Sequence, residues 1–332
     1  MKKLKVGFTY DAKADYKLEP GDAPDKYAEF DSEETLSEIE GALKSGGHEV
    51  VRIGHARSLL EKLRAGEKWD IVFNIAEGIK GRNREAQVPV ILEMFDIPYV
   101  GSDGLSMAAT LDKAVAKILV SAAGVRTPRF MEASSPADLA AFNLKFPVIV
   151  KPAAEGTSKG VSGDSRVSDI ESLKKIAGAL LDKYRQTILV EEFVSGKEFT
   201  VAVIGNSPPE ALPPVQVSIN GKLDLGDDFY FHARVTDPSI KYFCPSKISK
   251  SLDDKLKKLA VDAYKALGCR DLSRIDIRTD RDDEPFFLEC NPLPNLGLID
   301  VFPLVAEAMG TTYEKIVLKI LEHGAERYGL TR

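Results

Sequence analysis

Residues 272–297 read LSRIDIRTDRDDEPFFLECNPLPNLG. This stretch holds two strand-like runs, SRIDIRTD and EPFFLEC, on either side of a polar turn at 281–283, and this pattern predicts a β-hairpin. Ile275, Ile277 and Phe287 are strongly apolar, so we expect one face of the hairpin to be buried. The opposite face is polar and is the first candidate for a functional site.

The polar face of this hairpin is expected to carry four functional side chains, because strand side chains alternate between the two faces of a sheet. They are Arg274 and Asp276 on the first strand and Glu289 and Asn291 on the second. Two carboxylates and an amide offer hard oxygen ligands, which suit Mg²⁺ when phosphate oxygens complete its shell. A solvated face of an ordinary hairpin is the alternative, and the pattern alone leaves both interpretations open.

A second polar feature follows the apolar strand PVIVK at 147–151. Lys151 ends this strand, and a lysine in that position can hold a phosphate as a point charge. The next segment, AAEGTSKGVSG at 153–163, contains small residues whose backbone N–H groups can approach phosphate oxygens. It is not a Walker A loop, and an ordinary turn after a strand is the alternative interpretation.

A third feature, ILVEEFVSGKE at 188–198, is an apolar strand that ends in acidic and aromatic residues. Such a strand can hydrogen-bond an adenine and wall its ring, and Glu198 can bind a ribose hydroxyl. Taken alone, an ordinary strand with surface acids is the preferred explanation.

The first hundred residues alternate strand and helix patterns, which predicts a parallel sheet with ligands at the carboxyl ends of its strands. Strands are expected at 4–10, 48–53, 69–75 and 97–100, and helices at 31–46, 56–65 and 86–95. Asp31 is the expected N-cap of the first helix. The loop at 11–30 is long for a compact domain, and such loops are often functional.

The segment Gly-Ser-Asp-Gly at 101–104 marks the first boundary along the chain. Beyond it, helices are predicted at about 105–122, where Lys113 and Lys117 lie, at 136–143, 169–184 and 251–267, and from about 302 onward. A further strand is expected at 198–205, and residues 224–245 lack clean periodicity.

Composition limits the classes of function. The chain has 332 residues, enough for two or three domains, and its net charge of −6 does not suggest the basic face of a nucleic-acid binder. Its three cysteines and four histidines form neither a zinc-type spacing nor a disulfide framework. Its first residues, MKKLKVGFTY, lack the apolar run expected of a signal peptide, and no apolar stretch approaches the ~20 residues that span a bilayer. We expect a cytoplasmic protein that binds neither nucleic acid nor membrane.

The three polar features, in this order and at these separations, resemble the ATP-grasp superfamily and, more closely, the D-alanine–D-alanine ligase family. The resemblance lies in PVIVKPAAEGTSKGV at 147–161, VEEFVSGKEFTVAVI at 190–204, YFCPSKIS at 242–249, LGCRDLSRIDIR at 267–278 and FLECNPLPNLG at 287–297. It covers roughly residues 98–320 well and the first ninety loosely. It implies an α/β protein with an ATP-grasp fold and an N-terminal, doubly wound parallel-sheet domain.

That resemblance implies how ATP and its metal ions would be held. Adenine and ribose would contact Glu191, Phe193, Val194, Glu198 and Leu288, the phosphates would contact Lys113, Lys151, Thr157 and Ser158, and two Mg²⁺ ions, or Mn²⁺ in their place, would be bound by Asp276, Glu289 and Asn291. Arg274 would stabilise the tetrahedral intermediate. The irregular segment 224–245 would be the lid, with Arg234 as its catalytic cation.

On the substrate side, the chain departs from the family pattern. A segment that begins at Glu77 stands where the family has its first-domain His-Gly signature, and Ala233-Arg234-Val235 stands where the lid has a lysine and a tyrosine. Pro294-Asn295 replaces the Pro-Gly after the metal asparagine, and Asp300 replaces the serine of the acceptor site. The glutamate that holds the first amino group corresponds to Asp31. Asp31, Glu77, Asn295 and Asp300 are therefore substrate-site candidates. An acid at position 300 would repel a carboxylate and favour an amine or a cation.

Two functions fit this resemblance. The first is an ATP-dependent ligase that activates a small carboxylate as an acylphosphate and joins it to an amine, with D-alanine as one candidate substrate. The second is a catalytically silent ATP-binding protein of the same fold. Arg274 and all three metal ligands are present, and this favours the ligase because bare ATP binding needs neither. By analogy, the protein is expected to form a homodimer.

The same resemblance predicts three structural parts. Residues 1–103 would form the N-terminal substrate domain, 104–188 the central subdomain with the lysine strand and phosphate loop, and 189–332 the C-terminal subdomain with the adenine strand, lid and metal site.

Overall fold

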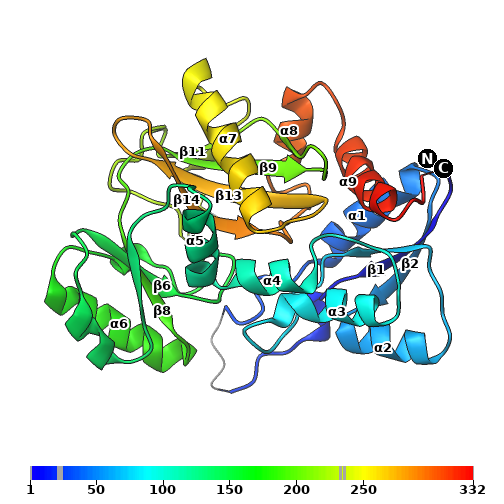
Figure 1. The fold of residues 1–332 in the computed structure, drawn as a ribbon, viewed down its shortest axis with the longest axis horizontal. Coiled ribbons are helices and arrows are strands. Elements are labelled where there is room, and N and C mark those ends of the chain that lie inside the picture. Colours follow the sequence, from blue (N-terminus) through cyan, green and yellow to red (C-terminus); the bar gives the residue numbers. More distant parts are fainter. Residues whose placement is uncertain (1, 21–24, 232–233, 235–236, 332) are drawn as a thin grey trace.

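The computed structural model describes residues 2–20, 25–231, 234 and 237–331. Three sheets follow one another along the chain and lie in different parts of the molecule (Figure 1). The first contains β1 (Lys5–Thr9), β2 (Glu49–Gly54), β3 (Ile71–Asn74) and β4 (Tyr99–Val100), all parallel and in the order β2-β1-β3-β4. The predicted parallel sheet is confirmed.

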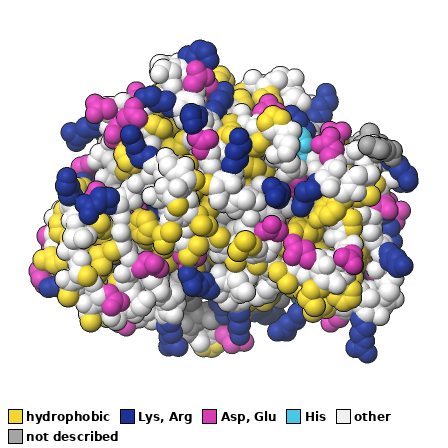
Figure 2. Space-filling model, viewed as in Figure 1, with side chains coloured by type: hydrophobic (Ala, Val, Ile, Leu, Met, Phe, Trp, Pro, Cys, Tyr) yellow, Lys and Arg dark blue, Asp and Glu magenta, His cyan; other side chains and the backbone are white. Residues whose placement is uncertain are grey.

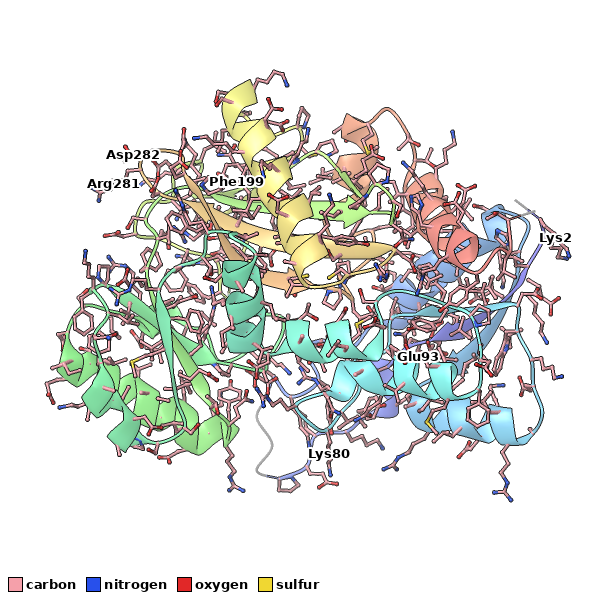
Figure 3. All side chains as sticks on the ribbon, viewed as in Figure 1. Lys2, Lys80, Glu93, Phe199, Arg281 and Asp282 are labelled. Atoms are coloured by element: carbon pink, nitrogen blue, oxygen red, sulfur yellow. The ribbon has the colours of Figure 1, made fainter. Side chains whose placement is uncertain are left out.

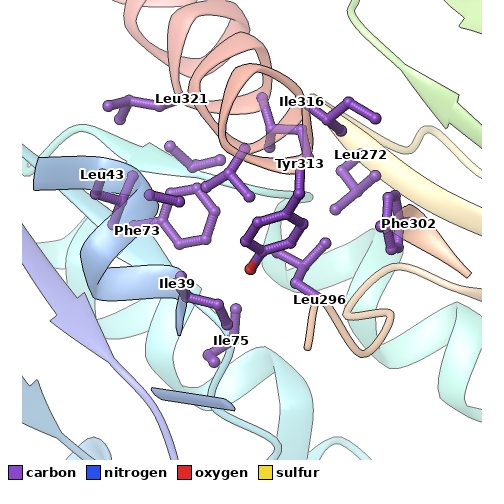
Figure 4. Packing of buried hydrophobic residues seen from close by; sticks show 14 of the residues in the cluster. Ile39, Leu43, Phe73, Ile75, Leu272, Leu296, Phe302, Tyr313, Ile316 and Leu321 are labelled. Atoms are coloured by element: carbon purple, nitrogen blue, oxygen red, sulfur yellow. The ribbon is translucent and has the colours of Figure 1, made fainter. Parts of the chain in front are cut away.

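Helices cover both faces of this N-terminal sheet. One face packs against α1 (Glu33–Ser45) and α9 (Tyr313–Arg327), and the other against α2 (Ala56–Arg64) and α3 (Gln87–Met94). The cluster on the first face also takes in Leu272, Leu296 and Phe302, so one core joins the two ends of the chain (Figure 4). This shared core places the loop around residue 296 beside α1.

The start of α1 differs from the prediction by one residue. Ser32, not Asp31, is the N-cap, because the Ser32 hydroxyl accepts a hydrogen bond from the Thr35 N–H at 3.1 Å. The side chain of Asp31 is therefore not used for capping.

The single helix predicted at 105–122 is wrong, since two helices occupy this region: α4 (Gly104–Leu111) and α5 (Lys113–Ala122). Asp112 leaves the helical conformation with ψ at 102°, and its Oδ1 accepts from the N–H groups of Ala114 and Val115. This cap restarts the helix and makes Lys113 its first residue.

The second sheet contains β5 (Phe130–Ala133), β6 (Val148–Pro152), β7 (Arg166–Val167) and β8 (Ile188–Glu192), in the order β5-β8-β6-β7 and antiparallel. Helix α6 (Ile170–Tyr184) packs on it through a shared apolar cluster. Short 3₁₀ helices lie at Lys13–Asp15, Arg84–Ala86, Pro136–Ala141 and Gly163–Ser165. The helix predicted at 136–143 is therefore a 3₁₀ helix.

The third sheet contains β9 (Glu198–Ile204), β10 (Glu210–Ala211), β11 (Val215–Ile219), β12 (Ile240–Phe243), β13 (Leu272–Thr279) and β14 (Pro285–Asn291). Its order is β12-β11-β9-β13-β14, with β10 beside β9. Helix α7 (Lys250–Ala266) packs against this sheet, and α8 (Phe302–Ala308) comes after β14 in the chain. Figure 3 places Arg281 and Asp282 at the outer end of the β13–β14 hairpin, as predicted.

The three sheets agree with a division into three parts, which we keep as a proposal. Strand β8, at the start of the proposed C-terminal part, pairs with β5 and β6, so we place the second boundary after Glu192.

Lys and Arg side chains are interspersed with Asp and Glu on the face shown in Figure 2. No helix within the described ranges is long and apolar enough to cross a membrane.

Candidate active site

The polar side chains of the β13–β14 hairpin form one contiguous group. Asp276 lies opposite Glu289, and Arg274 lies opposite Asn291. Asn291 Nδ2 donates to Asp276 Oδ2 at 3.0 Å, and Thr200 Oγ1 of the neighbouring strand donates to Asp276 Oδ1 at 2.6 Å. Arg274 Nε lies 3.3 Å from the same Oδ1 atom. The antiparallel register thus brings the predicted metal-binding residues together.

These residues offer a donor set that fits Mg²⁺. Asp276 and Glu289 supply carboxylate oxygens and Asn291 an amide oxygen, all hard ligands. No group of three or more His, Cys, Asp or Glu side chains in the described part of the chain is arranged to hold a metal by itself. Phosphate oxygens would therefore complete the shell, which is how nucleotide sites usually bind Mg²⁺.

The two lysines predicted for phosphate contact lie close to the proposed metal ligands. Lys113 Nζ is 3.2 Å from Glu289 Oε2 and donates to the backbone carbonyl of Glu155 in the phosphate loop. Burial opposes the charge of Glu289, but Lys113 and Lys151 outweigh it and lower the pKa of this carboxyl. The hairpin, the lysine strand and the phosphate loop therefore meet at one place.

Glu191 on β8 is held by two lysines. Lys151 Nζ lies 2.7 Å from Glu191 Oε1, and Lys117 Nζ lies 2.7 Å from Oε2. Burial opposes ionisation of this carboxyl, but the two lysines lower its pKa to about 2, so Glu191 is a carboxylate at neutral pH. Burial in turn lowers the pKa of Lys117 to about 8, with Glu191 opposing the shift.

Sequence reasoning did not assign Lys117 to the site. This side chain has no exposed surface and also donates to Thr127 Oγ1 at 2.9 Å. Its neighbours Ala116 and Val120 form part of the buried side of α5. A lysine at such a position was the available signal, because buried lysines are almost always paired.

Two of the residues predicted around adenine and ribose, Phe193 and Glu198, share Arg278 as a neighbour. The guanidinium of Arg278 is 4.8 Å from the Phe193 ring centroid, and its Nη1 is 3.0 Å from Glu198 Oε2. Burial raises the pKa of Glu198, with Arg278 opposing the shift. Val194 and Leu288 are half-buried.

The phosphate loop after β6 has an unusual backbone. Thr157 and Ser158 both have positive φ, 49° and 52°, a left-handed conformation that non-glycine residues seldom adopt. Strained backbone of this kind gathers at functional sites, where the surrounding structure holds it in place. The geometry is consistent with a loop shaped for a ligand.

Glu29 holds this loop from the N-terminal domain and was missed by the sequence analysis. Its Oε1 accepts from the Gly156 N–H at 2.6 Å, and its Oε2 lies 2.9 Å from Lys159 Nζ. Arg84 Nη2 lies 3.0 Å from Glu29 Oε1. The only sequence signal was the long patternless loop at 11–30, which contains Glu29.

The four substrate-site candidates have different surroundings. Asp300 Oδ2 lies 3.6 Å from Arg274 Nη1, whereas exposed Asn295 accepts a hydrogen bond from the nearby Gly297 N–H. Burial raises the pKa of Asp31 to about 7, with Lys13 opposing the shift. Burial, and then Glu85, raise the pKa of Glu77 well above its usual value. The structure thus brings Asp300 to the polar face of the β13–β14 hairpin.

Arg234, predicted as the lid cation, contacts residues of its own segment. Its Nη1 lies 2.5 Å from Asp228 Oδ1 and donates to the Phe229 carbonyl at 2.9 Å. Among the described residues it contacts Asp228, Phe229 and Phe231, none of which lies on the β13–β14 hairpin. Its neighbours Ala233 and Val235 lie outside the described residues.

Comparison with known proteins identifies the family of this chain. A model described as D-ala D-ala ligase C-terminus matches residues 120–322, more than half of the chain. The chain belongs to the D-alanine–D-alanine ligase family. A D-alanine–D-alanine ligase of Pelotomaculum thermopropionicum is 30% identical over 305 residues, which cover 89% of this chain and 92% of that protein. The uncharacterized protein y4sG of Sinorhizobium fredii is 34% identical over 300 residues, 87% of each chain.

Solved structures of the D-alanine–D-alanine ligase family share the fold. One from Bacillus anthracis, complexed with ATP, superposes with a TM-score of 0.73 at 22% identity and covers 98% of this chain and 99% of that one. The VanG D-Ala:D-Ser ligase from Enterococcus faecalis superposes with a TM-score of 0.74 at 20% identity, over 97% and 100%. The predicted family and the predicted α/β ATP-grasp fold are both confirmed.

Proposed function

We propose that this protein is an ADP-forming ligase that uses ATP and Mg²⁺ to join a small carboxylate to an amine. The observation that carries the proposal is the meeting of Lys113, Lys151, Asp276 and Glu289, with Arg274 beside Asp276. Phosphoryl transfer depends mainly on positioned reactants and on cations that balance phosphate charge. Lys113, Lys151 and Arg274 supply the cations, and the carboxylates of Asp276 and Glu289 supply ligands for a metal ion, next to the proposed phosphate loop.

The residues have separate proposed roles at the nucleotide. Lys113 and Lys151 contact the phosphates, with Thr157 and Ser158 on the loop above them. Glu191, Phe193, Val194 and Leu288 surround adenine, and Glu198 holds the ribose. Asp276, Glu289 and Asn291 would hold Mg²⁺, which would supply positive charge to the phosphate oxygens.

The proposed reaction has two steps. A carboxylate oxygen of the donor attacks the γ-phosphorus of ATP, the bond to the bridging β,γ-oxygen breaks, and ADP leaves. The amine nitrogen of the acceptor then attacks the acyl carbon of the acylphosphate, the carbon–oxygen bond breaks, and phosphate leaves with loss of one proton from nitrogen. Arg274 stabilises the oxyanion of the tetrahedral intermediate, where a fixed cation lowers the barrier.

On the substrate side, we propose that Asp31 and Glu77 lie at the donor and that Asn295 and Asp300 lie at the acceptor. Arg234 serves as the lid cation in this scheme. Two metal ions, use of Mn²⁺, a homodimer and a cytoplasmic location are further predictions from the family resemblance.

The first experiment measures ATP-dependent phosphate release with Mg²⁺ against D- and L-amino acids, dipeptides and amines, with mass detection of the products. A D-alanyl-D-alanine product would identify D-alanine as the substrate, and another conjugate would identify other substrates for the same chemistry. ATP binding without phosphate release across the panel would contradict the ligase proposal and favour a silent ATP-binding protein.

A further inference from the structure

Arg274 lies between two carboxylates. Its Nε is 3.3 Å from Asp276 Oδ1, and its Nη1 is 3.6 Å from Asp300 Oδ2. Asp276 is at the metal face, so Asp300 marks the other end of the guanidinium. Arg274 thus already contacts two carboxylates before any acceptor arrives.

Two tyrosines border this ion pair. Tyr242 donates a hydrogen bond to Tyr230, and burial raises the pKa of both phenols, so both rings are neutral. Asp300 and Arg274 act electrostatically on each of them. Tyr242 also packs against the apolar cluster that contains Leu296, in the loop before Asp300.

The N-terminal domain adds negative charge to the same region. The loop before Asp300 is fixed on α1, where the Leu298 N–H donates to Glu38 Oε2 at 2.8 Å. A β-carbon on Gly297 would lie 2.9 Å from Thr35 Oγ1, which shows how closely loop and helix approach. Glu38 therefore lies beside the loop that leads to Asp300, and Asp300 itself is paired with Arg274.

We infer that the acceptor amine presents a second positive charge to Asp300, and that it is a diamine or a similar cationic amine. A carboxylate placed there would face Asp300, whose partner Arg274 already contacts a second carboxylate, and like charges at close range discriminate strongly between ligands. This inference rests on the proposed ligase function and names the acceptor class of the same site.

The test starts from a reaction that does not depend on the acceptor subsite. Wild-type protein is given Mg²⁺, ATP and hydroxylamine with each D- and L-amino acid in turn, and the hydroxamate product identifies the donor. The donor with the highest rate is then paired with D-alanine, D-alaninamide or 1,2-diaminopropane. These acceptors share a three-carbon skeleton and carry a carboxylate, a neutral amide or an ammonium group at the same place.

We expect kcat/KM to be highest for the diamine and at least about tenfold above that for D-alanine, since a direct charge-assisted contact is worth about that factor. In Asp300→Ser and Asp300→Asn, the ratio of diamine to D-alanine should fall about tenfold or more. Asp254→Ser is the matched control, because Asp254 lies on α7 with its side chain 60% exposed and should leave the ratio unchanged.

Each result is decisive. Wild-type preference for D-alanine, or an unchanged ratio in both Asp300 variants, would overturn the acceptor assignment while leaving the ligase chemistry standing. Absence of hydroxamate with every donor would instead refute the ligase function, and the acceptor assignment with it. Thermal unfolding of each variant checks that it is folded, and Asp300→Asn, which keeps the side-chain shape, serves where Asp300→Ser does not fold.

Discussion

Glu29 Oε2 lies 2.9 Å from the Nζ of Lys159, and this contact joins the N-terminal domain to the phosphate loop. Both side chains are almost fully buried, with 5% and 6% of their surface exposed. Glu29 also accepts from the Gly156 N–H, so one carboxylate holds the backbone and a side chain of the loop. The N-terminal part of the chain and the loop after β6 are thereby physically connected.

Replacing Glu29 with Gln should loosen this loop. Arg84 and Lys159 would lose a buried anionic partner, so we expect the free energy of unfolding to fall by about 1.5–3 kcal/mol, the range for hydrogen bonds to charged groups. The KM for ATP should rise and hydrogen exchange of residues 154–160 should quicken. Glu171→Gln is the control, because its side chain is 79% exposed and such changes usually alter stability by less than about 0.5 kcal/mol. Unchanged exchange in the loop would contradict the connection.

Replacing Lys117 with Met should weaken ATP binding through Glu191, the proposed adenine contact, and not through the phosphates. Glu191 would keep only Lys151, and removing one partner of a buried ion pair typically costs about 3–5 kcal/mol. Chemical denaturation and calorimetric ATP titration measure the two effects. Lys258→Met, on an exposed part of α7, should show neither. Normal ATP affinity in folded Lys117→Met would show that this lysine only stabilises the fold.

The metal assignment predicts a specific response to Mg²⁺. Asp276→Asn and Glu289→Gln each remove a charged oxygen ligand, so we expect the Mg²⁺ concentration for half-maximal activity to rise tenfold or more, on the order seen when metal-site residues are altered. Chelation of Mg²⁺ should abolish phosphate release from the wild-type protein. An unchanged Mg²⁺ dependence in both variants would place the metal elsewhere.

Asp31 predicts two opposite pH trends. Its carboxyl has a pKa of about 7, above the ordinary 3.8, mainly because of burial. Folding therefore favours the protonated form, and this group should lower the free energy of unfolding as pH rises from 3.8 to about 7. Ionised Asp31 is the form that holds an ammonium group, so the donor KM should fall as pH rises through about 7. Both trends should vanish in Asp31→Asn, and a donor KM with the same pH profile in that variant would remove Asp31 from the donor site.

Local sequence was sufficient to predict that the proposed metal ligands share one face of the hairpin. Asp276, Glu289 and Asn291 lie on two strands joined by a short turn, so alternation of side chains along the hairpin brings them together. The order of the later motifs was sufficient for the ATP-grasp fold. The break at Asp112 was missed because helical periodicity continues across it, and only the capping geometry separates α4 from α5.

The sequence by itself therefore determined the family, the hairpin and the order of the three polar segments, because these depend on neighbours in the chain. Only the tertiary structure decided that Lys117 pairs with Glu191, that Glu29 reaches Lys159 and that Asp300 meets Arg274. These partners lie far apart in the chain and come from separate elements. Their meeting depends on how the sheets pack and on the burial that makes an unpaired charge costly, and no local pattern records either.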